Sequence, residues 1–299
     1  MSMISIVTST YNRADLLVRC WESLYKQTSR DFEWIIVDDG SIDDTESVVE
    51  GLIARSANDA KSFSIKYFHK ENGGKHTALN VAAKHVSGEY VLFLDSDDYL
   101  TPDAVEKCID LWKKYEADAR VGMVIFLKGE SRDKPCCSVS RTDEGHPVDF
   151  LKTRRITYIH SDCCEVVRSD LFVQHPFPEY PHERFMAEGA LWNKIGLSYM
   201  CVYSNEVIYL CKYLDDGLTK AGRSLRIHNP NGGMYNASLC MRRGNHVKTR
   251  VKNAVLYTCY GFFAKKPVLE MLDGCTNKRL MLTFLPFGGL LYMYWKRYL

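Results

Sequence analysis

Residues 90–98 read Tyr90-Val91-Leu92-Phe93-Leu94-Asp95-Ser96-Asp97-Asp98 and pass directly from an apolar run to a cluster of carboxylates. A short, uninterrupted run of β-branched, leucine and aromatic residues is typical of a strand that is buried on both faces. The acidic residues follow at once, so they belong to the carboxyl end of that strand. The stretch therefore predicts a buried strand whose end carries polar chemistry.

The chain before this stretch repeats the pattern of a short apolar run followed by an amphipathic segment. The apolar runs predict strands at residues 4–7, 34–37 and 65–68. The amphipathic segments predict three helices. The first covers residues 16–25, the second begins after Ser41 or Asp43 as its cap, and the third runs through residues 78–82. Buried strands that alternate with helices indicate an α/β fold, with a Rossmann-like, mostly parallel sheet and helices on both faces.

Polar residues stand at the ends of three of the predicted strands, those at residues 4–7, 34–37 and 90–94. They are Thr-Ser-Thr-Tyr-Asn-Arg at 8–13, Asp-Asp-Gly-Ser at 38–41 and Asp-Ser-Asp-Asp at 95–98. Ligands of open parallel sheets bind beyond the carboxyl ends of the strands. We therefore expect one binding site along this edge of the sheet.

The second half of the chain is expected to continue with helices and strands and to end in a helical region. The expected elements are a helix from Pro102 through Trp112, a strand at 121–127, a loop at 128–150, strands at 164–167 and 207–210, and a helix between them near 187–195. From about Met234 onward the pattern is helical, basic and aromatic. We expect a catalytic domain at residues 1–216, with halves at 1–115 and 116–216, and a C-terminal region at 217–299.

Composition excludes several classes of protein. The chain has 299 residues, of which 46% are hydrophobic and 25% are charged, so wholesale disorder is excluded. No charged segment followed by an apolar run and a cleavage site marks a signal peptide, and no run of about 18 apolar residues predicts a membrane span. The eleven Cys lack zinc-type spacing, which favours buried, reduced thiols in a cytosolic protein.

Charge is distributed unevenly along the chain. Residues 1–216 carry about −10 and residues 217–299 about +12, within a net charge of +2. Such an asymmetry indicates an anionic partner, either nucleic acid or anionic lipid. The carboxylate-lined edge gives nucleic acid no further support, so we expect none.

The last residues favour the lipid. Residues 281–299 are apolar and aromatic and contain the pair Lys296-Arg297. Pro286 and Gly288-Gly289 are expected to break the run, so that the segment lies in the membrane interface with its aromatic rings at headgroup depth. The alternative is an ordinary C-terminal helix that packs on the catalytic domain.

Asp95 and Asp97 suit a hard divalent cation. Carboxylate oxygens are preferred by Mg²⁺ and Mn²⁺, which share their coordination with substrate phosphates. Gathered carboxylates repel one another unless a cation or hydrogen bonds compensate. A solvated acidic turn that caps the following helix is the alternative interpretation.

The first 115 residues resemble family 2 glycosyltransferases, which have the GT-A fold. The shared elements are Thr-Ser-Thr-Tyr-Asn-Arg at 8–13, Val-Asp-Asp-Gly-Ser at 37–41, Asn-Gly-Gly-Lys-His-Thr-Ala-Leu-Asn at 72–80, Gly-Glu-Tyr at 88–90 and Leu-Asp-Ser-Asp-Asp at 94–98. Their order and spacing agree with the family, although Ser9 stands where Pro is usual. The resemblance implies a nucleotide-sugar donor, expected to be linked to UDP, and an inverting reaction that requires Mn²⁺ or Mg²⁺.

The resemblance also implies roles for individual residues. Ser9 and Asp39 are expected to contact the base, Asp95 the nucleoside, and Asp97, with Asp95, the metal that bridges the diphosphate. The remaining expected donor contacts are Tyr11, Arg13, Lys75, Asn80 and Ser96. Arg13 could equally be a surface residue after a turn. Single His residues are weak candidates for a metal ligand or donor contact: His76, His160, His182 and His228.

Glu188 is the expected general base. An inverting transfer needs one carboxylate that deprotonates the acceptor hydroxyl. In the family this base precedes a Leu by three residues and an aromatic by four, as Glu188 precedes Leu191 and Trp192. Ala187 replaces the family's usual Glu, and Glu replaces its usual Asp. The alternative is that Glu188 only favours the N-terminus of a helix.

These features together predict a transferase that elongates a saccharide acceptor. The acceptor is expected to be lipid-linked, as in bacterial polysaccharide assembly, and the enzyme cytoplasmic and peripheral on the inner face of the cell membrane. A catalytically inactive nucleotide-sugar or membrane-binding module is the alternative. A nucleotidyltransferase would need a Gly-rich phosphate loop after the first strand, and residues 8–13 contain no Gly.

Overall fold

The computed structural model describes residues 3–57, 62–136, 144–156, 163–211 and 218–297. The chain divides into two compact units, the first Met1–Pro176 with Ser198–Lys212 and the second Phe177–Leu197 with Tyr213–Leu299. The boundary expected after residue 216 lies at 212–217, outside the described residues. The division into a catalytic domain and a C-terminal region therefore stays a prediction.

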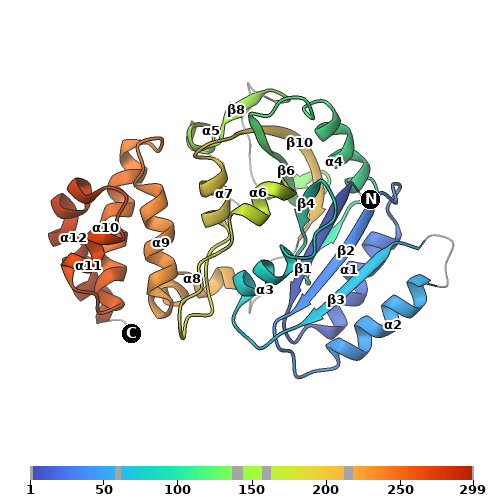
Figure 1. Cartoon of the computed structure of the whole chain (residues 1–299), viewed down its shortest axis with the longest axis horizontal. Helices are drawn as coiled ribbons and strands as arrows, with labels where there is room; N and C mark the ends of the chain where they lie inside the picture. The colour runs from blue at the N-terminus through green and yellow to red at the C-terminus, as the bar shows by residue number, and fades with distance from the viewer. Residues whose placement is uncertain (1–2, 58–61, 137–143, 157–162, 212–217, 298–299) are drawn as a thin grey trace. The chain divides into compact units, whose positions relative to one another are not determined.

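The first half of the first unit contains the predicted parallel strands and helices. The strands are β1 Ile4–Thr10, β2 Phe32–Asp38, β3 Ser64–His69 and β4 Tyr90–Phe93, and the helices are α1 Ala14–Tyr25, α2 Thr45–Ala57 and α3 Lys75–Ala82. The strands lie in the order β3-β2-β1-β4 and all run parallel (Figure 1). The predicted α/β fold with a parallel sheet is confirmed here.

The second half of the sheet is mixed. Its elements are β5 Tyr99–Leu100, α4 Ala104–Lys113, β6 Val121–Ser131, β7 Lys134–Pro135, β8 Pro147–Asp149, α5 Phe150–Ile156, β9 Cys163–Arg168, α6 Ser169–Gln174 and β10 Met200–Leu210. The order continues from β4 as β9-β6-β10-β5, with β9 antiparallel to both β4 and β6. Strand β10 is parallel to β6.

The prediction of a loop at residues 128–150 is in part wrong. Strand β6 continues to Ser131 and pairs with β7 in an antiparallel arrangement, while β8 pairs with the start of β10. The polar composition of this segment suggested a loop, but β6 continues beyond its last pair with β9, at Leu127, and its polar residues Glu130 and Ser131 are exposed there. Residues 137–143 lie outside the described part of the chain.

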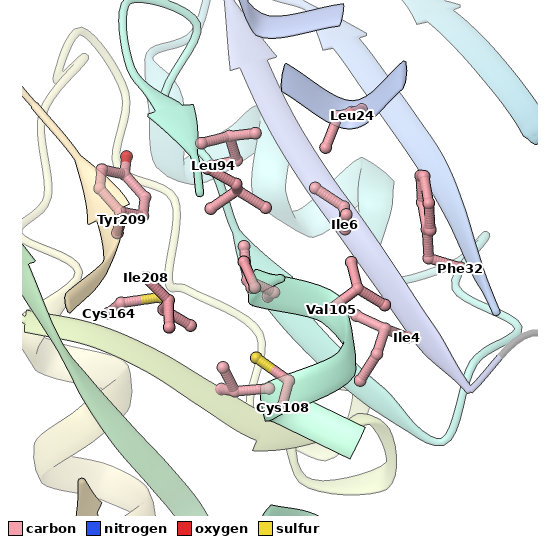
Figure 2. Close-up of a cluster of buried hydrophobic side chains, with 14 of the residues drawn as sticks. Ile4, Ile6, Leu24, Phe32, Leu94, Val105, Cys108, Cys164, Ile208 and Tyr209 are labelled. Atoms are coloured by element: carbon pink, nitrogen blue, oxygen red, sulfur yellow. The ribbon is translucent and has the colours of Figure 1, made fainter. Parts of the chain in front are cut away.

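The core of the first unit lies where helices cover the parallel strands. Figure 2 shows side chains from β1, α1, β2, α4, β9 and β10 gathered in one cluster, among them Ile4, Ile6, Leu24, Phe32, Val105 and Ile208. Cys108 and Cys164 pack in the same cluster. The ten Cys that the structure describes are all free thiols, and all but Cys136 are buried, which agrees with the expected reduced set.

The second unit is helical. Its elements are α7 Gly189–Ile195, α8 Leu218–His228, α9 Pro230–Cys240, α10 Val247–Phe263, α11 Val268–Asp273 and α12 Lys278–Lys296. Its core is formed by side chains of α8 to α12, including Met234, Tyr257, Met271 and Trp295. The expected helical C-terminal extension is therefore present. None of the helices in the described ranges is long and apolar enough to cross a bilayer.

Helix α12 corrects the expectation that Pro286 and Gly288-Gly289 break the run. The helix is continuous through all three residues. Pro286 cannot donate to the carbonyl of Leu282, a residue on the exposed side of the helix, where water can bond that carbonyl. Gly288 faces α10 so closely that a Cβ there would lie 1.7 Å from Thr258 Oγ1. The glycine therefore permits close helix packing and does not end the helix.

Candidate active site

Three strand ends meet along one edge of the parallel sheet. Thr10 pairs with Asp38, and the amide of Asp39 donates to the carbonyl of Thr10 at 2.9 Å. The amide of Leu94 donates to the carbonyl of Val7, also at 2.9 Å. The edge predicted from the sequence therefore exists, and it brings residues 8–13, 38–41 and 95–98 together.

The loops after β1 and β2 are fastened to each other. The amide of Asn12 donates to Ser41 Oγ at 2.8 Å, and Asn12 Oδ1 accepts from the amide of Ile42 at 2.9 Å. Asn12 has a φ of 51°, a left-handed conformation that Asn tolerates better than most residues. This fixed turn leaves Tyr11 exposed and directs Arg13 toward the end of β4.

Asp39 anchors the loop that contains the Asn-Gly-Gly motif. Its buried carboxylate accepts from Lys70 Nζ at 2.7 Å and from the amides of Gly73 and Gly74 at 3.0 and 2.7 Å. Gly74 has a φ of 94°, which favours glycine. The expected contact of Asp39 with a base stays a prediction, and a base must share this carboxylate with the loop.

Asp95 and Asp97 are each paired with a cation. Lys75, the first residue of α3, bonds Asp95, and Lys128 from β6 lies 3.7 Å from it. Arg13 Nη1 donates to Asp97 Oδ2 at 2.6 Å. Burial raises the pKa of Asp95, but the charges of Lys75 and Lys128 outweigh burial and hold that pKa well below its usual value. Asp95 is therefore ionised across the physiological range.

Two further residues at this edge, Lys128 and Tyr209, did not emerge from the sequence, and they meet Asp98 of the predicted acidic stretch there. Lys128 Nζ lies 4.0 Å from the ring centre of Tyr209, whose hydroxyl accepts from the amide of Asp95 at 2.9 Å and bonds the Asp98 carboxyl. Burial and then the charge of Asp95 raise the pKa of Asp98 to about 7. The one available signal was Lys128 itself, a charged residue directly after the apolar run 121–127.

The residues at this edge fit a divalent cation that the donor helps to coordinate. Among the described residues, no group of three or more His, Cys, Asp and Glu side chains gathers as a metal site. Asp95 and Asp97 therefore supply at most two carboxylates, and Mg²⁺ or Mn²⁺ sites of this kind take the remaining ligands from water and substrate phosphates. In this structure the positive charges of Arg13 and Lys75 compensate the negative charges of these carboxylates.

Arg13→Ala should strengthen Mn²⁺ binding about fivefold, because the cation no longer competes with Arg13 for Asp97. A partly exposed ion pair contributes up to about 1 kcal/mol, which corresponds to that factor. Titration of free Mn²⁺ by electron paramagnetic resonance measures the change, with Arg55→Ala, an arginine on α2 that stacks on Trp21, as control. Equal affinity in the wild type and the Arg13 variant would remove Asp97 from the metal site.

The other predicted side chains lie as follows. Ser9 and Asn80 are half-buried, on β1 and α3, and Ser96 is buried between Asp95 and Asp97. Of the weak His candidates, His76 is buried on α3, and His228 Nδ1 lies 2.9 Å from the carbonyl oxygen of Ser224. His160 lies outside the described residues.

Glu188 belongs to the second unit, whereas the residues predicted to hold the donor and the metal belong to the first. It stands at the N-terminus of α7, and its carbonyl accepts from the amide of Leu191 at 2.8 Å. Its side chain is half-buried, and Leu191 and Trp192 are buried. The local structure is therefore a helix start with a carboxylate on it, as both sequence interpretations require.

Comparison with known proteins identifies the family. The sequence model of the family described as "Glycosyl transferase family 2" matches residues 5–172. Chondroitin synthase of Escherichia coli is 39% identical over 112 residues, which cover 38% of this chain and 16% of that protein. The chain thus matches only a small part of this relative's length.

Solved structures confirm the GT-A fold. S. aureus TarS 1-349 in complex with UDP-GlcNAc has a TM-score of 0.64 at 19% identity, over 96% of this chain and 79% of that one. The mannosyltransferase PcManGT from Pyrobaculum calidifontis, in complex with GDP-Man and Mn²⁺, has a TM-score of 0.59 at 17% identity, over 98% and 87%.

Proposed function

The chain belongs to glycosyltransferase family 2, and from that premise we propose that it is a metal-dependent inverting enzyme that transfers a sugar from a UDP-linked donor to a saccharide hydroxyl. The observation that supports this most is the edge where Asp95 and Asp97 meet Arg13, Lys75 and Lys128. Carboxylates suit the metal, and the cations suit a diphosphate. The arrangement thus offers both charges that a metal–diphosphate complex needs.

Asp97 and Asp95 would hold Mn²⁺ or Mg²⁺, which would supply a Lewis acid to neutralise the charge of the diphosphate. Arg13 and Lys75, which pair with these carboxylates here, would then be available to bond phosphate oxygens. Asn80 and Ser96 stand beside them in the sequence motifs and are proposed to contact the donor. Ser9, Tyr11 and Asp39, on the ends of β1 and β2, are proposed to hold its base.

Glu188 is proposed to activate the acceptor. Its carboxylate takes the proton of the acceptor hydroxyl as the hydroxyl oxygen bonds to the anomeric carbon. The bond from that carbon to the phosphate oxygen breaks, and its electron pair leaves with the nucleoside diphosphate. Attack from the face opposite the leaving group inverts the anomeric configuration, with no covalent enzyme intermediate.

Nucleotide release and product stereochemistry test this function. The protein is incubated with Mn²⁺ and UDP-glucose, UDP-N-acetylglucosamine or UDP-glucuronic acid, and UDP is measured with and without saccharide acceptors. We expect one donor to release UDP only with metal, and proton magnetic resonance to show a β-linked product from an α-linked donor. Retention of configuration would exclude the mechanism. Donor binding with no release from any donor would favour an inactive module.

Helix α12 supports a membrane-bound setting for the reaction. Leu282, Phe287, Leu290, Met293 and Tyr294 are each 48–59% exposed. At 3.6 residues per turn they occupy one arc of about 140°. Basic residues stand at both ends of the helix: Lys278, Arg279, Lys296 and Arg297. An exposed apolar helix face flanked by cations is typical of attachment to an anionic bilayer surface.

We propose on this basis that the enzyme is cytoplasmic and peripheral on the inner face of the cell membrane. A lipid-linked saccharide, as in the assembly of bacterial surface polysaccharide, would meet the enzyme at that surface. The opposite face of α12 packs on α10 and buries Met281 and Trp295. Packing of one face and membrane attachment of the other are therefore compatible.

The double change Phe287→Ser/Leu290→Ser should weaken binding to vesicles of phosphatidylglycerol and phosphatidylcholine by more than about tenfold. Each side chain contributes about 1.5–3 kcal/mol when buried in an apolar phase. Vesicle sedimentation measures the change, and Val173→Ser, an equally exposed apolar residue in the first unit, is the control. Equal binding by all three proteins, or binding by none to anionic vesicles, would contradict membrane attachment through α12.

A further inference from the structure

The segment that leads into Glu188 is held by a buried carboxylate. Glu183 Oε1 accepts from the amide of Asn231 at 2.8 Å and from its Nδ2 at 2.7 Å, and Glu183 Oε2 accepts from the amide of Gly232 at 2.9 Å. These amides belong to the first turn of α9, where backbone donors lack a helical partner. A negative charge there is further stabilised by the helix dipole. Glu183 thus ties its own segment to α9.

Asn229 completes the connection in the opposite direction. Its Oδ1 accepts from the amides of Arg184 and Phe185 at 2.7 and 3.0 Å, and its Nδ2 donates to the carbonyl of Leu225 at 2.7 Å. Asn229 is 7% exposed and Glu183 is 9% exposed. Buried hydrogen bonds to a charged group are among the stronger ones in proteins. Three successive residues, 183–185, are therefore fixed on α9 from both sides.

The backbones of the two segments are in direct contact. A Cβ on Gly232 would lie 2.9 Å from the carbonyl oxygen of Phe185, so a side chain there would push the segments apart. Met186, the next residue, is 4% exposed. Only Ala187 then separates this anchored run from Glu188, whose own carbonyl begins the hydrogen bonding of α7. The backbone of Glu188 is thus held on its N-terminal side by α9 and on its C-terminal side by α7.

We propose that Glu183 and Asn229 are positioning residues that hold the Glu188 carboxylate in place for proton abstraction. The proposal rests on the proposed function, in which Glu188 is the base. Capping of α9 alone needs neither the two bonds from Asn229 back to residues 184 and 185 nor the close approach of Gly232. Displacement of a reacting group by about 1 Å can lower the rate about a hundredfold. A clamp of this kind therefore serves turnover as well as folding.

The test uses Glu183→Gln and Asn229→Ala in the full chain. Asn277→Ala is the matched control, because Asn277 Oδ1 accepts from the amide of Leu280 at 3.1 Å and caps α12 in the same unit, away in sequence from residues 183–188. Loss of such a cap costs about 1 kcal/mol. Turnover is measured with the UDP-sugar that releases UDP fastest among UDP-glucose, UDP-N-acetylglucosamine and UDP-glucuronic acid. Hydrogen exchange at the amides of residues 184 and 185 is measured alongside.

We expect kcat to fall about ten- to a hundredfold in both clamp variants, with KM for the donor and Kd for UDP within about twofold. Exchange at residues 184 and 185 should accelerate in Asn229→Ala. Asn277→Ala should melt at a lower temperature with kcat unchanged. Asn229→Asp keeps the oxygen that accepts from residues 184 and 185 but loses the donor to the Leu225 carbonyl, so kcat should fall less than in Asn229→Ala, which also serves if Asn229→Ala does not fold.

Two results would overturn the clamp. One is a lower melting temperature with unchanged kcat in Glu183→Gln and Asn229→Ala, as in the control. The other concerns the double variant Asn229→Ala/Glu188→Gln. If Asn229 acts through the Glu188 carboxylate, the effects of the two changes on kcat are not additive. A kcat lower than that of Glu188→Gln by the full factor that Asn229→Ala causes alone would therefore contradict the clamp. Full turnover in Glu188→Gln itself would instead show that Glu188 is not the base. That result is obtained without changing Glu183 or Asn229, so it is distinguishable from failure of the clamp.

Discussion

Glu188→Gln should lower kcat by about 100- to 10,000-fold and leave the affinity for UDP and for the donor within about twofold. General base catalysis contributes a factor of that size, and an amide cannot accept the proton of the acceptor hydroxyl. The side chain keeps its length and nearly its shape, so the N-terminus of α7 is preserved. Initial rates over a range of donor concentrations measure kcat and KM, and calorimetry measures UDP binding.

Glu179→Gln is the control for this change, because it removes an exposed carboxylate nine residues earlier in the same unit. Its kcat should equal that of the wild type. If Glu188→Gln turned over normally, the base would have to be another group. If it lost donor binding while kcat at saturation stayed normal, Glu188 would be a donor ligand and the assignment of the base would be wrong.

Asp97→Ala should lower metal-dependent turnover by at least about a hundredfold while the protein stays folded. A metal that stabilises the departing diphosphate contributes several kcal/mol, and each 1.4 kcal/mol is a factor of ten in rate. The change also leaves Arg13 without its present carboxylate partner, so thermal stability is expected to change little at this partly exposed position. UDP release as a function of Mn²⁺ concentration measures the effect.

Asp103→Ala provides the matched control. Its carboxylate is as exposed as that of Asp97 and forms ion pairs with Arg132 and Lys107, which hold its pKa at about 2 against the cost of burial. The control should lose some stability and keep its response to Mn²⁺. Activity of Asp97→Ala equal to that of the wild type at every Mn²⁺ concentration would remove Asp97 from the metal site.

The edge where the polar ends of the strands meet could be predicted from the sequence because its residues follow strands directly. In a parallel sheet, apolar runs of similar length bring their carboxyl ends to the same edge. Asp95 and Asp97 after β4, and Arg13 after β1, therefore had to meet if the strands were neighbours, and they do. Periodicity predicted where these residues lie, whereas their expected roles in donor binding came from the family resemblance.

Residues delivered by distant strands could not be predicted in the same way. Lys128 and Tyr209 reach Asp95 from β6 and β10, and their approach depends on the mixed half of the sheet, whose order is not encoded in local pattern. Asp39 lies at the end of its strand as expected. Its hydrogen bonds with Lys70 and with the amide of Gly74 depend on tertiary contacts.

The helical second unit also has features that could not be predicted from the sequence. Pro286 and Gly288 are poor helix formers by intrinsic propensity, yet contact with α10 keeps α12 continuous. The bonds between residues 183–185 and residues 229–232 join positions 44 to 49 apart, a distance at which no sequence periodicity operates. Tertiary packing decides both features.

The proposed function depends above all on binding of a nucleotide sugar through a metal at Asp95 and Asp97. Calorimetric titration of the wild-type protein with UDP, first with Mn²⁺ and then with a chelator, tests it most directly. We expect UDP to bind with Mn²⁺, to bind at least about tenfold more weakly with chelator, and to bind more tightly than ADP under the same conditions. Equal binding with and without metal, or no binding of UDP, GDP or ADP to the folded protein, would contradict this proposal.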